Sequence, residues 1–332
     1  MKQAPLRIVH CATFCTDKFG MDYYSGNHKI SNGLIRNGHN VYDFSYRDIA
    51  RKEALLKIKS LGITKMNQRL IETVSAVQPD LLLLGHSELI ANETLFEIRK
   101  IMPNMKIAMW WVDPLDGFLV NRDFFIERIN WVDEFFLTTD PKELKNFFAL
   151  DKRLENIHFM PNICDASMDN GRAFDVEDPR HDLLFIGRKA DLRATLIEFL
   201  ETELTDLNVG LYGQNRDTLV QGRAYIDLLS ECRMAINFSR YNDISLYSSD
   251  RQVQLAANGC LTFTPETANM RDLFSAEEMV YFSDLKDLKN KIMHYHAHPD
   301  EGRLIAKAGH ARAHRDYECQ AVTAQIINKI FS

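Results

Sequence analysis

Two short segments in the second half of the chain combine positive charge with backbone that a ligand can approach closely. Gly187-Arg188-Lys189 follows an apolar run and offers a flexible turn with two cations, and Ser249-Asp250-Arg251 opens a helical pattern and adds a third cation. Backbone N–H groups at a helix start and fixed cations are the groups that bind phosphate. Both segments are therefore candidates to bind a diphosphate. The alternative is that Arg188 and Lys189 are surface charges and that Arg251 pairs with Asp250.

Two residues in the first half of the chain could accept a proton. His86 follows the most apolar run of the chain, and Asp113 follows another run that ends in Trp110-Trp111. Imidazole and carboxylate groups serve as general bases toward a hydroxyl group. The alternative for His86 is a histidine that caps the following helix. For Asp113 it is an ordinary turn residue before a proline.

Other reactive patterns are incomplete or missing. Cys11 and Cys15 form a pair that no second Cys/His pair completes, although structural zinc needs four ligands. His294, His296 and His298 alternate with a period that does not fit one helical face, so we interpret them as solvated. No Asp-x-Asp pair suited to Mg²⁺ or Mn²⁺ is present, so we expect no metal site. The serine-hydrolase elbow and the phosphate-binding P-loop pattern are missing too.

The scaffold that would position these residues is indicated by alternating apolar and helical segments. The run 81–86, which is continuously apolar and closed by glycine, is typical of a strand buried on both faces of a parallel sheet. Helices are expected over 26–37, 51–78 and 92–102. The other expected strands lie at 6–11, 40–44, 106–111, 134–139, 158–162, 182–188, 207–212, 234–238, 260–264 and 279–282. This spacing predicts βαβ units in doubly wound sheets, which bind ligands beyond the carboxyl ends of their strands.

The alternation is interrupted once, by a polar stretch with glycine and proline that predicts a linker over 166–181. We therefore expect an N-terminal domain over 1–165 and a C-terminal domain over 182–332, with the last helix a candidate to pack back on the N-terminal domain. We expect an α/β fold class, with two Rossmann-like domains that face each other across a cleft.

Composition excludes several classes of protein. The chain has 332 residues, 45% of them hydrophobic, and a net charge of −6 with scattered basic residues, so no nucleic-acid partner is expected. The N-terminus lacks the apolar core of a secretion signal, and no apolar run approaches the ~20 residues that cross a bilayer. Without a secretory context, the six cysteines are interpreted as buried thiols. We therefore expect a cytoplasmic protein.

Three segments in the second half of the chain read as successive strands: 182–188 with a Phe-x-Gly turn, 211–213 and 230–239. In these segments, from about Gly187 onward, the chain resembles the bacterial "glycosyl transferases group 1" family, in particular the donor domain of its spore-maturation-protein-like members. The segment 249–260 matches the pattern Arg-x-x-Glu-x-x-Ala-x-Gly, apart from Gln254 in place of the glutamate. The N-terminal half is similar in layout only.

This resemblance implies a GT-B glycosyltransferase that moves a sugar from a nucleotide-sugar donor to a polysaccharide, glycolipid or glycoprotein. The family's glutamate is held to accept hydrogen bonds from the donor ribose, and an amide accepts them without the added strength of a charge. With a glycan, lipid-linked or protein acceptor, association with the inner face of the cytoplasmic membrane stays open. The implied donor-binding residues are Gly187, Arg188, Lys189, Tyr212, Gly213, Asn237, Ser249, Arg251 and Gln254.

The expected mechanism uses no cofactor and no metal, because protein cations would neutralise the leaving diphosphate. His86 or Asp113 would act as the base if configuration is inverted, and His86 would hydrogen-bond the transferred sugar if configuration is retained. Two alternatives stay open: a non-catalytic sugar-nucleotide-binding or scaffold protein, which the departure at Gln254 favours, and a sugar-nucleotide epimerase of the same two-domain type.

Overall fold

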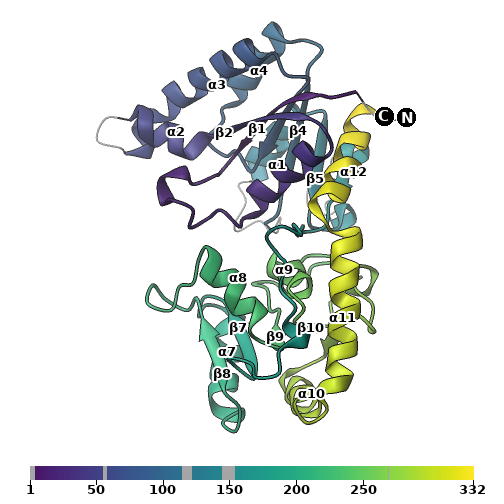
Figure 1. Cartoon of the computed structure of the whole chain (residues 1–332). Helices are drawn as coiled ribbons and strands as arrows, with labels where there is room; N and C mark the ends of the chain where they lie inside the picture. The colour runs from purple at the N-terminus through teal and green to yellow at the C-terminus, as the bar shows by residue number, and fades with distance from the viewer. Residues whose placement is uncertain (1–3, 55–57, 114–121, 144–153, 268) are drawn as a thin grey trace. The chain divides into compact units, whose positions relative to one another are not determined.

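A computed structural model describes residues 4–54, 58–113, 122–143, 154–267 and 269–332. The chain divides into two compact units. The first contains residues 1–160 and 319–332, and the second contains residues 161–318. Figure 1 shows the elements of both units.

The first unit is built on a parallel six-stranded sheet in the order β2-β1-β3-β4-β5-β6. Its strands are β1 (Arg7–Ala12), β2 (Asn40–Ser45), β3 (Leu81–Gly85), β4 (Lys106–Trp111), β5 (Glu134–Leu137) and β6 (Ile157–Phe159). Its helices are α1 (Gly26–Arg36), α2 (Tyr46–Glu53), α3 (Ile63–Val77), α4 (Asn92–Ile101), α5 (Arg122–Ile129) and α12 (Cys319–Phe331). The order reverses between β1 and β3, so the carboxyl ends of these strands form the switch point where ligands of such sheets bind.

Side chains alternate between the two faces of this sheet. Val9 and Cys11 of β1, for example, join a core with the apolar faces of α3, α4 and α5. His10 points to the other face, where its ring contacts Ser31 of α1. Helix α12 packs against α1, and Asn37 at the end of α1 donates a hydrogen bond to the Thr323 hydroxyl over 3.0 Å. Helices therefore cover both faces of the sheet.

The second unit has a parallel five-stranded sheet in the order β11-β10-β9-β7-β8. Its strands are β7 (Leu183–Ile186), β8 (Val209–Tyr212), β9 (Met234–Ile236), β10 (Leu261–Pro265) and β11 (Val280–Phe282). Its helices are α7 (Leu192–Glu203), α8 (Arg223–Ser230), α9 (Arg251–Ala257), α10 (Leu285–Ala297) and α11 (Pro299–Asp316). Helices α7 and α10 pack on one face of the sheet, and α8 and α9 pack on the other. The switch point of this sheet lies between β7 and β9.

The predicted α/β class with two doubly wound parallel sheets is confirmed, and all eleven expected strands are present. The single helical pattern expected over 51–78 is wrong. Helix α2 ends at Glu53, and after the 3₁₀ turn Lys59–Gly62 a separate helix begins at Ile63. Gly62 lies directly against the end of α2, because a Cβ there would be 1.9 Å from the Ala50 carbonyl oxygen. The segment 166–181, which sequence alone designates a linker, lies inside the second unit, where Asp169 and Phe174 are buried.

Candidate functional site

The carboxyl edge of the second sheet gathers most of the predicted donor-binding residues. Gly187 follows β7, and its N–H donates to the Tyr212 carbonyl at the end of β8 over 2.9 Å. Gly213 has a φ of +74°, which favours glycine, and a Cβ there would lie 3.4 Å from the Gly187 nitrogen. A Cβ on Gly187 would itself be 2.9 Å from the Phe185 ring. The two glycines therefore bring the backbone at the ends of two adjacent strands close together, with Gly187 buried and Gly213 partly exposed.

The end of β9 connects this edge to the start of α9. Asn237 is buried, donates to the Thr264 hydroxyl over 3.0 Å and accepts a hydrogen bond from the Ser249 hydroxyl over 3.4 Å. The Ser249 N–H donates to the Ser239 hydroxyl over 2.9 Å. These bonds fix the long loop between β9 and α9 against the sheet, and they place Arg251 at the switch point.

Arg251 lies over the Phe185 ring at 5.6 Å and donates to the Phe238 carbonyl over 3.1 Å. Two further arginines lie near it, one in the first turn of α7 and one in the loop after β9. Burial lowers the pKa of Arg193, and the positive charges of Arg251 and Arg240 lower it further. Arg240 also forms a 3.1 Å ion pair with Asp191. The charges of Arg251 and Arg240 therefore act on Arg193, and Arg193 lies beside the first glycine, since its Cδ would be 3.6 Å from a Cβ on Gly187.

Arg193 and Arg240 were missed by the sequence reasoning, which considered only the residues directly after each strand. A usable signal existed for Arg193. It lies in the first turn of the helix that follows the first strand of the second series, where cations meet ligands bound at a helix start. The Nε atom of Arg193 is buried and makes no hydrogen bond within the part of the chain that the structure describes. Its N–H group can therefore donate a hydrogen bond to a bound anion.

Three predicted residues lie differently from the expectation. Arg188 and Lys189 are exposed, and Lys189 lies 3.6 Å from Glu201 of α7. The Tyr212 hydroxyl lies 2.9 Å from Nε2 of His181, which precedes β7. The tyrosine side chain therefore reaches back toward the amino ends of the strands, and only its backbone belongs to the edge that carries Gly187.

Gln254 is buried in a chain of hydrogen bonds. Its side-chain oxygen accepts from the Tyr225 hydroxyl of α8 over 2.7 Å, and its nitrogen donates to Asp250 over 3.1 Å. The amide suits this position because it accepts on one side and donates on the other, which a carboxylate cannot do. In this arrangement the oxygen that a ribose would contact already has a protein partner.

In the first unit, the two candidate bases come together. His86 follows β3 with a φ of +56°, and its Nδ1 lies 3.6 Å from Asp113 Oδ2 after β4. Its ring stacks on Trp111 at 4.1 Å, and the Val112 N–H points at Nε2 over 3.4 Å. With Nε2 accepting, the proton of the neutral ring belongs on Nδ1, on the side of Asp113.

The electrostatics of this pair favour a neutral imidazole. Burial lowers the pKa of His86, and Asp113 and Glu88 only partly oppose that effect. The Asp113 side chain is 62% exposed, whereas that of His86 is 21% exposed. Asp113 is thus the member of the pair that a ligand reaches more easily, whereas His86 is the more buried member beside it.

A buried chain of polar groups lies beneath this pair. Trp110 Nε1 donates to His10 Nε2 over 3.1 Å, His10 Nδ1 lies 2.8 Å from the Ser31 hydroxyl, and that hydroxyl donates to Asp43 over 2.6 Å. Serine stands between histidine and aspartate, so this is not the order of a nucleophilic triad. Burial, assisted by the charge of His28, lowers the pKa of His10 to about 3.

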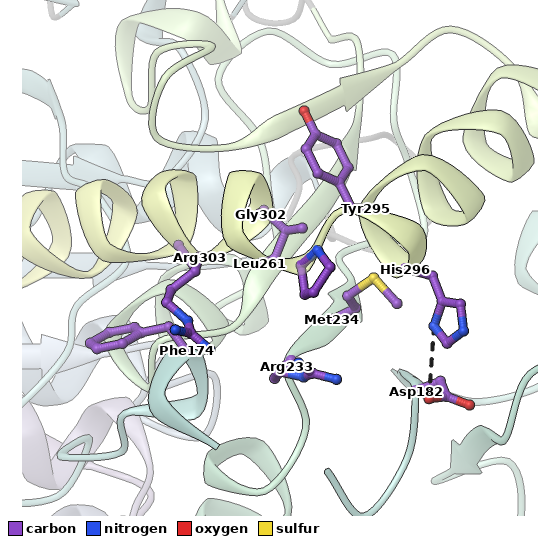
Figure 2. A pocket seen from close by; sticks show the side chains of 11 residues that line it. Phe174, Asp182, Arg233, Met234, Leu261, Tyr295, His296, Gly302 and Arg303 are labelled. Carbon is purple, nitrogen blue, oxygen red and sulfur yellow. Dashed lines mark ion pairs between the residues drawn. The ribbon is translucent and has the colours of Figure 1, made fainter. Parts of the chain in front are cut away.

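Figure 2 shows a pocket at the opposite, amino-terminal edge of the second sheet. Asp182, Met234 and Leu261 line it at the starts of β7, β9 and β10, and the dashed line marks the 3.8 Å pair between Asp182 and His296. None of the sequence-predicted site residues lines this pocket.

Comparison with known proteins relates the chain to a family and to a fold. Residues 188–328 match a family described as "Glycosyl transferase-like", whereas a search of curated proteins finds no match. No helix among the described residues is long and apolar enough to cross a membrane.

Three solved structures align over nearly the whole chain. A sucrose-phosphate synthase from Thermosynechococcus elongatus shares 12% identity over 97% of both chains, with a TM-score of 0.65. An alpha-glucosyltransferase in complex with UDP and DNA shares 12% identity over 98% of this chain and 100% of that one, with a TM-score of 0.66. HepE from Anabaena in complex with UDP shares 10% identity over 98% and 99% of the two chains, with a TM-score of 0.59. At these identities the likeness establishes the fold.

Proposed function

We propose that the chain, whose residues 188–328 match a glycosyl transferase-like family and whose two units have the GT-B fold, transfers a sugar from a nucleoside-diphosphate sugar to an acceptor hydroxyl. The observation that carries this proposal is the convergence of Arg193, Arg240 and Arg251 at the switch point of the second sheet. Fixed cations beside glycines that carry no side chain are suited to a diphosphate.

In the proposed reaction, the acceptor oxygen forms a bond to the anomeric carbon while the bond from that carbon to the diphosphate breaks. The leaving diphosphate gains negative charge, and the three guanidinium groups stabilise it. They would do the work that a divalent cation does elsewhere, so we propose that transfer needs no metal. Uridine diphosphate is the first donor nucleotide to test, because HepE has been crystallised with UDP and with UDP-glucose.

The first unit would supply the acid–base chemistry of an inverting reaction. We assign proton acceptance to the pair of His86 and Asp113, in which the exposed carboxylate faces the ligand and the neutral imidazole orients it. If configuration is retained, no base is needed, and His86 would hydrogen-bond the transferred sugar instead.

The proposed acceptor class is a glycan, a lipid-linked glycan or a glycoprotein, and the proposed location is the cytoplasm, with peripheral association at the inner face of the membrane for a lipid-linked acceptor. A thermal-shift screen of UDP-, GDP-, dTDP- and CMP-sugars tests donor binding, because a ligand that binds the folded state raises the melting temperature.

One specific observation favours a second candidate function, a non-catalytic sugar-nucleotide binder. The Gln254 oxygen is already bonded to Tyr225, so the family's usual ribose contact is altered. Nucleotide release that depends on an added acceptor identifies a transferase, whereas donor binding without acceptor-dependent release identifies a binder.

A further inference from the structure

The loop between β1 and α1 presents aromatic side chains to solvent at the carboxyl edge of the first sheet. Phe19 is 96% exposed and Tyr23 is 48% exposed. Phe19 also has a φ of +49°, a conformation that bulky residues seldom adopt. An exposed ring in a strained backbone contributes little to the folded core, and such outliers cluster at ligand sites.

This loop is held in place by its own polar contacts. Both the N–H and the hydroxyl of Thr16 donate to Asp48, over 2.8 Å and 2.9 Å. Lys18 forms a 2.6 Å ion pair with Asp22. The exposed rings therefore project from an anchored segment, which Figure 1 shows as the purple connection between β1 and α1.

A row of packed rings connects the loop to the proposed acid–base pair. Tyr23 contacts His28 at 5.1 Å, and His28 contacts Phe14 at the same distance. From Phe14 the row continues through His10 at 5.3 Å and Trp110 at 6.0 Å, and the Trp110 ring lies 5.6 Å from His86. The rings of Phe14, His10 and Trp110 are buried, so the row packs beneath the surface and holds the loop on the same stretch of the sheet edge as His86, at the switch point between β1 and β3.

The charges around this stretch indicate a neutral ligand. Arg51 pairs with Asp17 at 2.6 Å and with Asp48 at 3.1 Å, and Arg47 pairs with Glu88 beside His86. With Lys18 also paired, these cations are neutralised by carboxylates on the same edge. A phosphate or an anionic bilayer would meet no excess of positive charge here.

An extended neutral glycan fits this combination. A pyranose ring has an apolar C–H face and polar edges, and tyrosine provides an apolar face with a hydroxyl at its edge. The carboxylates and arginines along the stretch supply partners for sugar hydroxyls.

We propose that the loop 13–25 is an acceptor subsite that binds the body of a neutral oligosaccharide by stacking on Phe19 and Tyr23, with the acceptor hydroxyl directed toward the pair of His86 and Asp113. This proposal rests on the proposed function and specifies its acceptor.

The test uses the full chain on a printed array of neutral, sulfated and sialylated glycans, followed by titration of the strongest neutral binder. Phe19→Ala and Tyr23→Ala should each raise its apparent Kd about three- to tenfold, the effect of losing one ring contact. Tyr42→Ala is the matched control, because Tyr42 is also 48% exposed and lies on β2 of the same unit. The Tyr42→Ala variant should bind the glycan as tightly as the wild type.

Three results overturn the inference: no neutral glycan binds, the two loop variants bind as tightly as the wild type, or phosphatidylglycerol vesicles compete while glycans do not. A parallel titration with UDP separates this outcome from failure of the proposed function. A chain that binds UDP but no neutral glycan loses only the acceptor assignment. A chain that binds glycan through Phe19 and Tyr23 but no nucleotide retains the subsite and loses the transferase proposal.

Discussion

Replacement of Gln254 by glutamate, the residue usual in the family, should destabilise this chain. The amide nitrogen that now donates to Asp250 over 3.1 Å would become a carboxylate oxygen, and this buried negative group would face the exposed carboxylate of Asp250. At an effective dielectric constant near 20, two like charges ~4 Å apart repel by about 4 kcal/mol. Solvent around the exposed Asp250, relaxation and protonation reduce this cost, so we expect Gln254→Glu to lower the free energy of unfolding by about 1–3 kcal/mol at pH 8.

The loss should depend on pH in a defined direction. Burial and the neighbouring Asp250 would raise the pKa of the introduced carboxyl group in the folded protein above its unfolded value. The destabilisation is therefore small below the unfolded pKa and grows as pH rises through the folded one. Urea denaturation of the wild type and Gln254→Glu at pH 5 and pH 8 measures this difference.

Tyr225→Phe is the matched control. It removes the hydroxyl that Gln254 accepts from over 2.7 Å and adds no charge. Its cost should be about 1 kcal/mol and the same at both pH values. Equal stability of Gln254→Glu and wild type at pH 8, or a deficit that does not change with pH, would refute the hydrogen-bond assignment at this position.

Three further measurements test the acid–base pair, the buried His10 and the metal requirement. His86→Ala and Asp113→Asn should each reduce turnover ~10²–10⁴-fold with unchanged UDP affinity. Near-normal turnover per folded molecule would show that the two residues have a structural role only. The pKa of buried His10 is lowered to about 3, so the unfolded chain binds a proton at this residue at a higher pH than the folded chain does. The free energy of unfolding of the wild type should therefore fall as pH drops below ~6.5, by up to about 1.4 kcal/mol per pH unit. His10→Gln should reduce that slope in urea titrations. Transfer should persist in EDTA; activity that chelation abolishes and Mn²⁺ restores would contradict the metal-independent proposal.

The sheet scaffold was predictable from sequence because its signal is local. Continuous apolar runs such as 81–86 mark strands buried on both faces, and the glycines that end them mark the turns. The split between α2 and α3 was not predictable from helical spacing, because it depends on close packing of Gly62 against Ala50. This contact is between residues of separate elements, so the periodicity of apolar residues along the sequence does not reveal it.

The candidate site was predictable in position but not in composition. Strand ends pointed to Gly187 and Arg251, and the structure places both at one edge of the second sheet, because every parallel strand ends at the same edge. Arg193 and Arg240 reach the same place through the folding of α7 and of the loop after β9. Neither residue directly follows a strand, so inspection of the strand ends in the sequence does not find them. The partners of Gln254 were equally hidden, since Tyr225 lies 29 residues away on another helix.

The central claim, that the second unit binds a nucleotide diphosphate through its arginines, is tested most directly by calorimetric titration of UDP into wild type and Arg193→Ala. Arg193 is the cleanest position, because its Nε has no hydrogen-bond partner among the described residues. Loss of one charge-assisted contact should weaken binding by ~1.5–3 kcal/mol, or about 10- to 150-fold in Kd. Arg180→Ala, which removes an exposed arginine paired with Glu231, should bind as wild type. An unchanged Kd for Arg193→Ala, or equal weakening by Arg180→Ala, would contradict the claim.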